Sequence, residues 1–140
     1  MKNLFVVSVF LVASCLFAAN TQAQLIIITN PAAKATEISN TDLRDVFTGS
    51  ASSLKDVGRV APVLLKAGTV HEEFLHAYIG KSDATYRAYW RSLVFSGQVA
   101  MPKSVDTEGT LVDYVAHNPG TIGYISKQTP HESVKVLAVK

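Results

Sequence analysis

Hydrophobic and polar positions divide the chain into an apolar leader, residues 1–23, and a segment, residues 24–140, in which strand and helix patterns alternate. Residues 25–29 are a continuous, largely β-branched run, which predicts a strand buried on both faces, as in a parallel sheet covered by helices. The other expected elements are strands at 59–65, 121–125 and 134–139 and helices at 39–49, 69–80, 83–96 and 108–117. Strands joined through helices predict an α/β fold with helices packed on a mostly parallel sheet. Only the final connection is short enough for an antiparallel neighbour.

Polar residues mark where the helices begin. Ser39 with Asp42 three residues later has the form of a capping box, and Thr69 with Glu72 has the same form. Asp83 is expected to cap the next helix. These residues therefore predict the N-termini of three helices.

An aromatic stripe follows within the third helix. Tyr86, Tyr89, Trp90 and Leu93 recur at helical spacing, which is typical of a face packed on the core. Pro62 lies inside the second strand, where it removes one ladder donor, so we expect that strand to lie near a sheet edge at this position.

A helix stop leads directly into a strand at residues 118–125. Pro119 cannot continue a helix and Gly120 can adopt a positive φ, so the preceding helix must end here. Gly123 lies in the middle of the strand, where a glycine indicates either close packing against a neighbour or a ligand nearby.

The apolar leader has the features of a signal peptide. Residues 1–23 combine a short basic start, an apolar run too short for a confident membrane span, and a cleavage signal ending at Ala23. Residues 24–140 would then be the exported domain. The alternative is lipidation of Cys15, although the apolar run continues past it. Because Cys15 is the only cysteine, the exported part can form no disulfide and no Cys-ligated metal site.

Composition narrows the range of partners. The chain carries 13 basic and 11 acidic residues, a formal net charge of +2, and the basic residues are scattered singly. No basic run would follow a nucleic-acid backbone or an anionic membrane, so neither is expected as a partner.

Residues 71–76 approach the zinc-protease pattern without matching it. His71 and His76 are five residues apart, so on a regular helix they diverge by about 140° and cannot share one metal ion. Glu72 and His76 are expected to pair at the surface instead. With no nucleophile, phosphate-binding loop or dinucleotide motif in the sequence, we predict no enzyme, no cofactor and no metal site.

One turn suggests binding. Lys66, Gly68, Thr69 and Val70 lead from the end of a strand into a helix, where free backbone N–H groups and the helix dipole favour an anion. The simpler interpretation is that Thr69 only caps the helix, together with Glu72.

Several motifs in order resemble one family. Residues 43–49 and 54–63 combine a short helix ending in Val-Phe-Thr-Gly, a turn with Asp and Gly, and a strand near Pro-Val. Residues 120–125 read Gly-Thr-Ile-Gly-Tyr-Ile, and residues 89–102 contain Tyr-Trp, Phe-Ser-Gly and a later proline. Together they resemble the phosphate-type periplasmic substrate-binding proteins of ABC transporters, in a small single-domain branch. The resemblance extends from about residue 25 to residue 139.

This resemblance implies a single lobe of the type 2 periplasmic-binding-protein fold, a periplasmic location and an ancestry in oxyanion capture, with an ABC transporter as a candidate partner. The family's ligand motif is Arg, three residues, Ser-Gly-Thr. Gly68 and Thr69 match it, but Val63 and Ala67 replace the arginine and the serine. Lys66 is then the point charge left to hold an anion such as phosphate.

The sequence supports two candidate functions. The first is an exported, non-enzymatic domain that binds an oxyanion weakly. The alternative is a single-lobe protein–protein interaction or regulatory module of the cell envelope that transports no ligand. An exposed aromatic patch from Tyr86, Tyr89 or Trp90 would favour this alternative.

Overall fold

The computed structural model describes residues 24–140, so the predicted signal peptide and the lipidation of Cys15 lie outside the described residues. A six-stranded sheet has the strand order β2-β8-β1-β7-β5-β6, and two short strands form a separate hairpin. The sheet consists of β1 (Leu25–Thr29), β2 (Glu37–Ile38), β5 (Ala61–Leu65), β6 (Lys103–Val105), β7 (Thr121–Ser126) and β8 (Lys135–Val139). The hairpin consists of β3 (Ser53–Leu54) and β4 (Gly58–Arg59).

Parallel pairing prevails, which confirms the predicted fold class. β5 is parallel to both β6 and β7, and β2 is parallel to β8. The antiparallel strand is β1, which lies between β7 and β8 and opposes both. The expectation that residues 25–29 follow the pattern of a parallel strand is therefore wrong, and the short final connection joins β7 and β8, which pair with β1 on either side and not with each other. β1 is the first strand of the described residues, so no crossover from an earlier strand within residues 24–140 constrains its direction, and its apolar run fills the centre of the sheet.

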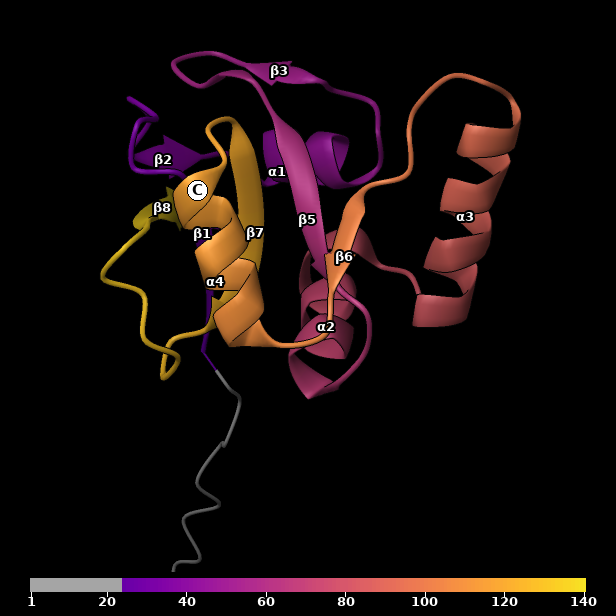
Figure 1. Cartoon of the computed structure of the whole chain (residues 1–140). Helices are drawn as coiled ribbons and strands as arrows, with labels where there is room; N and C mark the ends of the chain where they lie inside the picture. The colour runs from indigo at the N-terminus through magenta and orange to yellow at the C-terminus, as the bar shows by residue number, and fades with distance from the viewer. Residues whose placement is uncertain (1–23) are drawn as a thin grey trace, which may run out of the picture.

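Helices cover both faces of the sheet (Figure 1). Successive residues of a strand point to opposite faces. On β7, Gly123 lies beneath Leu111, whereas the Tyr124 ring stacks on Phe74 on the other face, with ring centroids 3.9 Å apart. The helices are α1 (Asn40–Phe47), α2 (Thr69–Phe74) with its π-helical continuation η1 (Leu75–Ile79), α3 (Asp83–Phe95) and α4 (Glu108–His117). None of the helices within residues 24–140 has the length and hydropathy needed to cross a bilayer.

Two of the predicted helix starts can be compared here. The Ser39 hydroxyl accepts the N–H of Asp42 at 3.0 Å, as the capping box predicts. The cap predicted at Asp83 is wrong, because Ser82 takes that role and accepts the N–H of Thr85 at 3.3 Å. Asp83 becomes the first helical residue, which leaves its carboxylate available for other partners.

Pro62 lies at a local edge inside an interior strand. It pairs with Ile122 of β7, but β5 meets β6 only from Val63 onward. On the β6 side Pro62 therefore has no ladder partner to lose, which agrees with the predicted edge position.

The aromatic stripe attaches α3, which stands apart from the sheet in Figure 1, to the end of α1. Tyr86 and Trp90 are buried, at 1% and 4% exposure, which confirms them as core residues. The Tyr86 hydroxyl and the Trp90 indole N–H both donate to the Phe47 carbonyl, and the Tyr89 hydroxyl donates to the Thr48 carbonyl. The polar groups of these aromatic residues are therefore bonded within the protein, and their rings form no exposed patch.

Candidate functional site

The predicted anion site lies where β5 ends and α2 begins. The parallel strands β5 and β6 lead toward the first residues of α2 and α4 respectively, so two helix N-termini meet at this end of the sheet (Figure 1). Gly68, Thr69 and Val70 line a hollow of about 380 Å³ there, together with the segment from Asp106 to Glu108. The structure thus brings three of the four predicted residues to one cavity.

Lys66, the fourth predicted residue, forms an ion pair with Asp106, which lines the hollow. Its Nζ lies 3.3 Å from Oδ1 of Asp106, and the two side chains are 54% and 78% exposed. Such an exposed pair is worth only about 0.2–1 kcal/mol, so an anion can compete for the lysine. The other carboxylate of the hollow, Glu108, is held by the N–H of Ser126 at 2.6 Å and the hydroxyl of Thr129 at 3.1 Å.

The start of α2 differs from the predicted capping box. Gly68 is the N-cap, with φ of 107°, and its carbonyl accepts the first helical hydrogen bond from Glu72. No side chain caps this helix, because glycine occupies the cap position and Thr69 is already helical. The interpretation of Thr69 as a cap is therefore wrong. The first N–H groups of α2 have no acceptor within the helix, and the Thr69 hydroxyl makes no hydrogen bond within residues 24–140.

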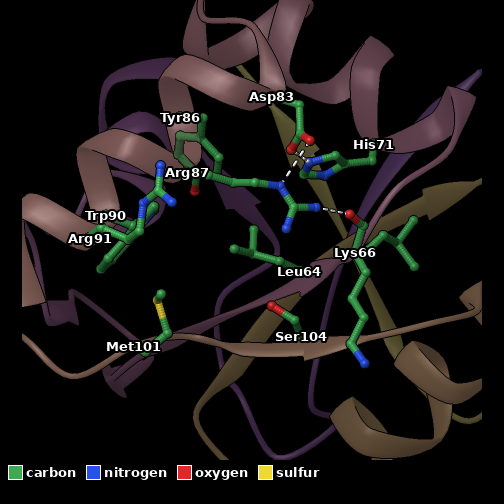
Figure 2. A pocket seen from close by; sticks show the side chains of 11 residues that line it. Leu64, Lys66, His71, Asp83, Tyr86, Arg87, Trp90, Arg91, Met101 and Ser104 are labelled. Carbon is green, nitrogen blue, oxygen red and sulfur yellow. Dashed lines mark hydrogen bonds and ion pairs between the residues drawn. The ribbon is translucent and has the colours of Figure 1, made fainter.

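A buried polar network that no sequence motif predicts lies beside this hollow. His71 is 2% exposed and Tyr124 is fully buried, and His71 Nδ1 is hydrogen-bonded to the Tyr124 hydroxyl. On its other side, His71 Nε2 lies 2.8 Å from Oδ1 of Asp83 (Figure 2). The Tyr124 hydroxyl also accepts the N–H of Leu65 at 3.0 Å. The network therefore links β5, β7, α2 and α3.

Arg87 extends the network to the surface. Its Nε donates to Oδ2 of Asp83 at 2.8 Å, and its Nη2 donates to the Lys66 carbonyl (Figure 2). Both oxygens of Asp83 are thus bonded within the protein. Burial raises the pKa of Asp83, but the hydrogen bonds from His71 and Arg87 outweigh burial, so its pKa lies below the ordinary value.

Proton positions follow from the environment of Tyr124. Burial raises the pKa of the Tyr124 hydroxyl well above its ordinary value, so the hydroxyl keeps its proton at neutral pH. Because the Leu65 N–H donates to this oxygen, the hydroxyl donates in turn to His71 Nδ1. His71 then carries its own proton on Nε2 and donates to Asp83. Each side-chain polar atom of Tyr124, His71 and Asp83 thus has a hydrogen-bond partner within the protein. The network therefore holds the elements in position and leaves no unpaired reactive atom.

The surface pair expected between Glu72 and His76 does not form. His71 is buried and His76 is exposed, and no ion pair within the described residues joins Glu72 to His76. A signal for burial was present, because His71 precedes Phe74 and Leu75 by three and four residues and so shares their face. No group of three or more His, Cys, Asp or Glu residues in positions 24–140 is arranged to hold a metal ion.

A second cavity, of about 190 Å³, lies between α3 and the sheet edge formed by β5 and β6 (Figure 2). Arg87 and Arg91 line it from α3, and Ser104 lines it from β6. The sequence does not predict this cavity, because the cavity depends on how far α3 stands from the sheet.

We compared the chain with known proteins and structures. Neither protein-family models nor curated proteins match the chain. Solved structures do match. One is a Clostridium perfringens protein with bound phosphate, assigned to the substrate-binding proteins of phosphate ABC transporters (TM-score 0.64, 19% identity). The others are an ABC-type phosphate transport receptor from Vibrio cholerae (0.55, 22%) and PstS from Borrelia burgdorferi (0.64, 19%). The chain has a periplasmic-binding-protein-like fold.

The likeness covers most of this chain but less than half of its fold neighbours. The three matches span 82%, 82% and 83% of this chain and 44%, 45% and 47% of the respective structures. At these identities the comparison shows the fold. Of the two positions that depart from the family motif, Val63 is a core residue at 1% exposure and Ala67 lines the hollow.

Proposed function

We propose that residues 24–140 are an exported, non-enzymatic domain that binds an oxyanion such as phosphate at Lys66, Gly68, Thr69 and Val70. One observation carries the proposal: α2 begins inside a hollow without a side-chain cap, so its first N–H groups and the Thr69 hydroxyl are available to an acceptor. Backbone N–H groups and the helix dipole stabilise an anion in that position. The phosphate bound in one fold neighbour supports the same ligand class.

The affinity should be low. The dipole contributes about 0.3–1 kcal/mol, and each charge-assisted hydrogen bond about 1.5–3 kcal/mol. Val63, buried in the core, provides no guanidinium, and Ala67 provides no hydroxyl. Lys66 is shared with Asp106, which lies 3.3 Å away. We therefore expect millimolar binding of phosphate.

The test is an NMR titration of the purified protein with phosphate and with sulfate. Saturable shifts should appear at the amides of Gly68, Thr69 and Val70. Lys66→Gln should weaken binding about two- to fivefold, the contribution of an exposed ion pair. Asp106→Asn should strengthen it by a similar factor, because it frees Lys66 and removes a negative charge.

Lys55→Gln provides the matched control, because Lys55 is also exposed but lies in the turn of the separate β3–β4 hairpin. It should leave the titration unchanged. Equal weakening in the Lys66 and Lys55 variants would mean that only net charge matters, and would overturn the proposed site. The same conclusion would follow if tens of millimolar phosphate left the three amides unshifted.

The proposal also covers where the protein acts and with which partner. A periplasmic location and a working contact with an ABC transporter are supported by the leader sequence and by the fold neighbours, which include transporter components. The alternative, an interaction or regulatory module of the envelope, has less support, because Tyr86 and Trp90 are buried.

A further inference from the structure

The cavity between α3 and β6 is separate from the proposed oxyanion site and has its own chemistry. Leu64 and Ser104 are register partners on β5 and β6 and both line it. Met101, which is 58% exposed, lies at its rim across from the α3 residues (Figure 2). A flexible thioether at the rim can adapt to ligands of different shape.

Two aromatic rings form an apolar wall. Tyr86 and Trp90 line the cavity, but the hydroxyl of Tyr86 and the indole N–H of Trp90 both donate to the Phe47 carbonyl. Their polar atoms are therefore already bonded. Tyr86, Trp90 and Leu64 are only 1%, 4% and 7% exposed, so they form the packed apolar floor of the cavity, whereas Met101 is its exposed apolar residue.

The polar atoms that remain are donors. Arg87 uses Nε and Nη2 on Asp83 and on the Lys66 carbonyl, which leaves its Nη1 available. Arg91, one turn further along α3, forms no ion pair or hydrogen bond within residues 24–140, and neither does the Ser104 hydroxyl. The acid in the lining, Asp83, has both oxygens bonded, to His71 and to Arg87.

We propose that this cavity binds a small organic carboxylate with one aromatic ring or a branched aliphatic body. An apolar cavity of about 150 Å³ holds one benzene molecule, so about 190 Å³ suits a single ring with its carboxylate near the opening. Arg87, Arg91 and Ser104 would bind the carboxylate, and the ring would pack on the floor formed by Trp90 and Leu64 and against Met101. An α-amino acid is disfavoured, because Arg87 and Arg91 repel its ammonium group and the carboxylate of Asp83 is already bonded to His71 and Arg87.

Trp90 makes the proposal measurable, since it is the only tryptophan of the chain and it lines the cavity. Titration with phenylacetate should change Trp90 fluorescence saturably, with a dissociation constant of about a millimolar or tighter. Phenylalanine, which adds an ammonium group to a similar body, should bind at least about tenfold more weakly, the effect expected of an unpaired charge. Phosphate alone should not change the Trp90 signal at concentrations that shift the amide of Gly68.

Titrations of substituted proteins show where phenylacetate binds. Arg91→Gln should weaken phenylacetate binding about tenfold, as expected for loss of a charge-assisted hydrogen bond. Ser104→Phe should abolish binding by filling the cavity from the edge strand. Arg59→Gln is the control, because Arg59 is an exposed arginine on the separate β3–β4 hairpin, and it should bind phenylacetate normally. Circular dichroism of each variant verifies folding.

Three results would overturn the proposal. These are an unchanged titration in Ser104→Phe, equal loss in Arg59→Gln and Arg91→Gln, or phenylalanine binding as tightly as phenylacetate. Because the two sites share neither ligand nor reporter, failure here leaves the oxyanion titration to be decided separately.

Discussion

Gly123 shows how one residue controls the packing of α4 on the sheet. A Cβ placed on it would lie 2.6 Å from Cδ2 of Leu111, and Leu111 is itself fully buried. Gly123→Ala should therefore reduce the free energy of unfolding by about 1–3 kcal/mol, the usual cost of overpacking a core. Urea unfolding followed by circular dichroism measures this change.

Gly109 provides the matched control on α4. A Cβ there would contact nothing within 4 Å, so Gly109→Ala should raise the free energy of unfolding by about 0.5–1 kcal/mol through helix propensity. If the two alanine variants change stability equally and in the same direction, close packing is not the reason for Gly123.

Other residue roles could be only partly predicted. The sequence left Gly123 open between packing and a ligand, and its position under Leu111 favours packing. For His71 the sequence predicted only that it diverges from His76, and its bonds to Tyr124 and Asp83 join residues 53 and 12 positions away. Helical periodicity could have indicated that His71 is buried, but no local pattern specifies a partner on a distant strand.

At the scale of elements, α3 depends on specific polar contacts for its position. Its aromatic donors bond the carboxyl end of α1, and Asp83 joins it to His71 of α2. Asp83→Asn should lower stability at neutral pH, because the amide cannot replace the carboxylate toward both His71 and Arg87.

The pH dependence of this effect has a definite sign. The folded-state pKa of Asp83 lies below its ordinary value of 3.8, so its contribution to stability is fully present above that pH. The contribution is lost as the pH falls through the lower, folded-state pKa. The stability difference between wild type and Asp83→Asn should therefore narrow below pH 3.8. Thermal unfolding at a series of pH values measures it, with Asp113→Asn on exposed α4 surface as control. A difference that is constant across this range would contradict the assignment.

The order of elements was easier to predict than their pairing. Apolar runs and caps located the main helices and strands, because these signals are local. The direction of β1 was missed, since a run buried on both faces fits either a parallel or an antiparallel neighbour. The cap of α2 was also missed, because the conformation of Gly68 decides whether Thr69 caps the helix or belongs to it.

For the molecule as a whole, the parallel strands β5 and β6 determine where binding can occur. Their carboxyl ends lead to the N-termini of α2 and α4, and the oxyanion hollow lies between these. The donor-lined cavity instead lies at the open edge of the sheet, under α3. Lys66 has its ammonium near the first and lines the second, where its carbonyl accepts from Arg87. The two sites are therefore adjacent but use different parts of this residue.

The proposed export concerns the whole chain, and it can be tested through the leader. If residues 1–23 are a cleaved signal peptide, periplasmic extracts should contain a protein whose N-terminus is Gln24, as mass spectrometry would show. Cys15→Ser should leave this product unchanged, whereas Ala23→Asp should block cleavage, because signal peptidase requires a small residue there. Incorporation of labelled fatty acid into the wild type, and its loss in Cys15→Ser, would establish lipidation instead. In that case the domain would be tethered at the membrane through a longer N-terminal segment, and a soluble periplasmic protein would be the wrong description.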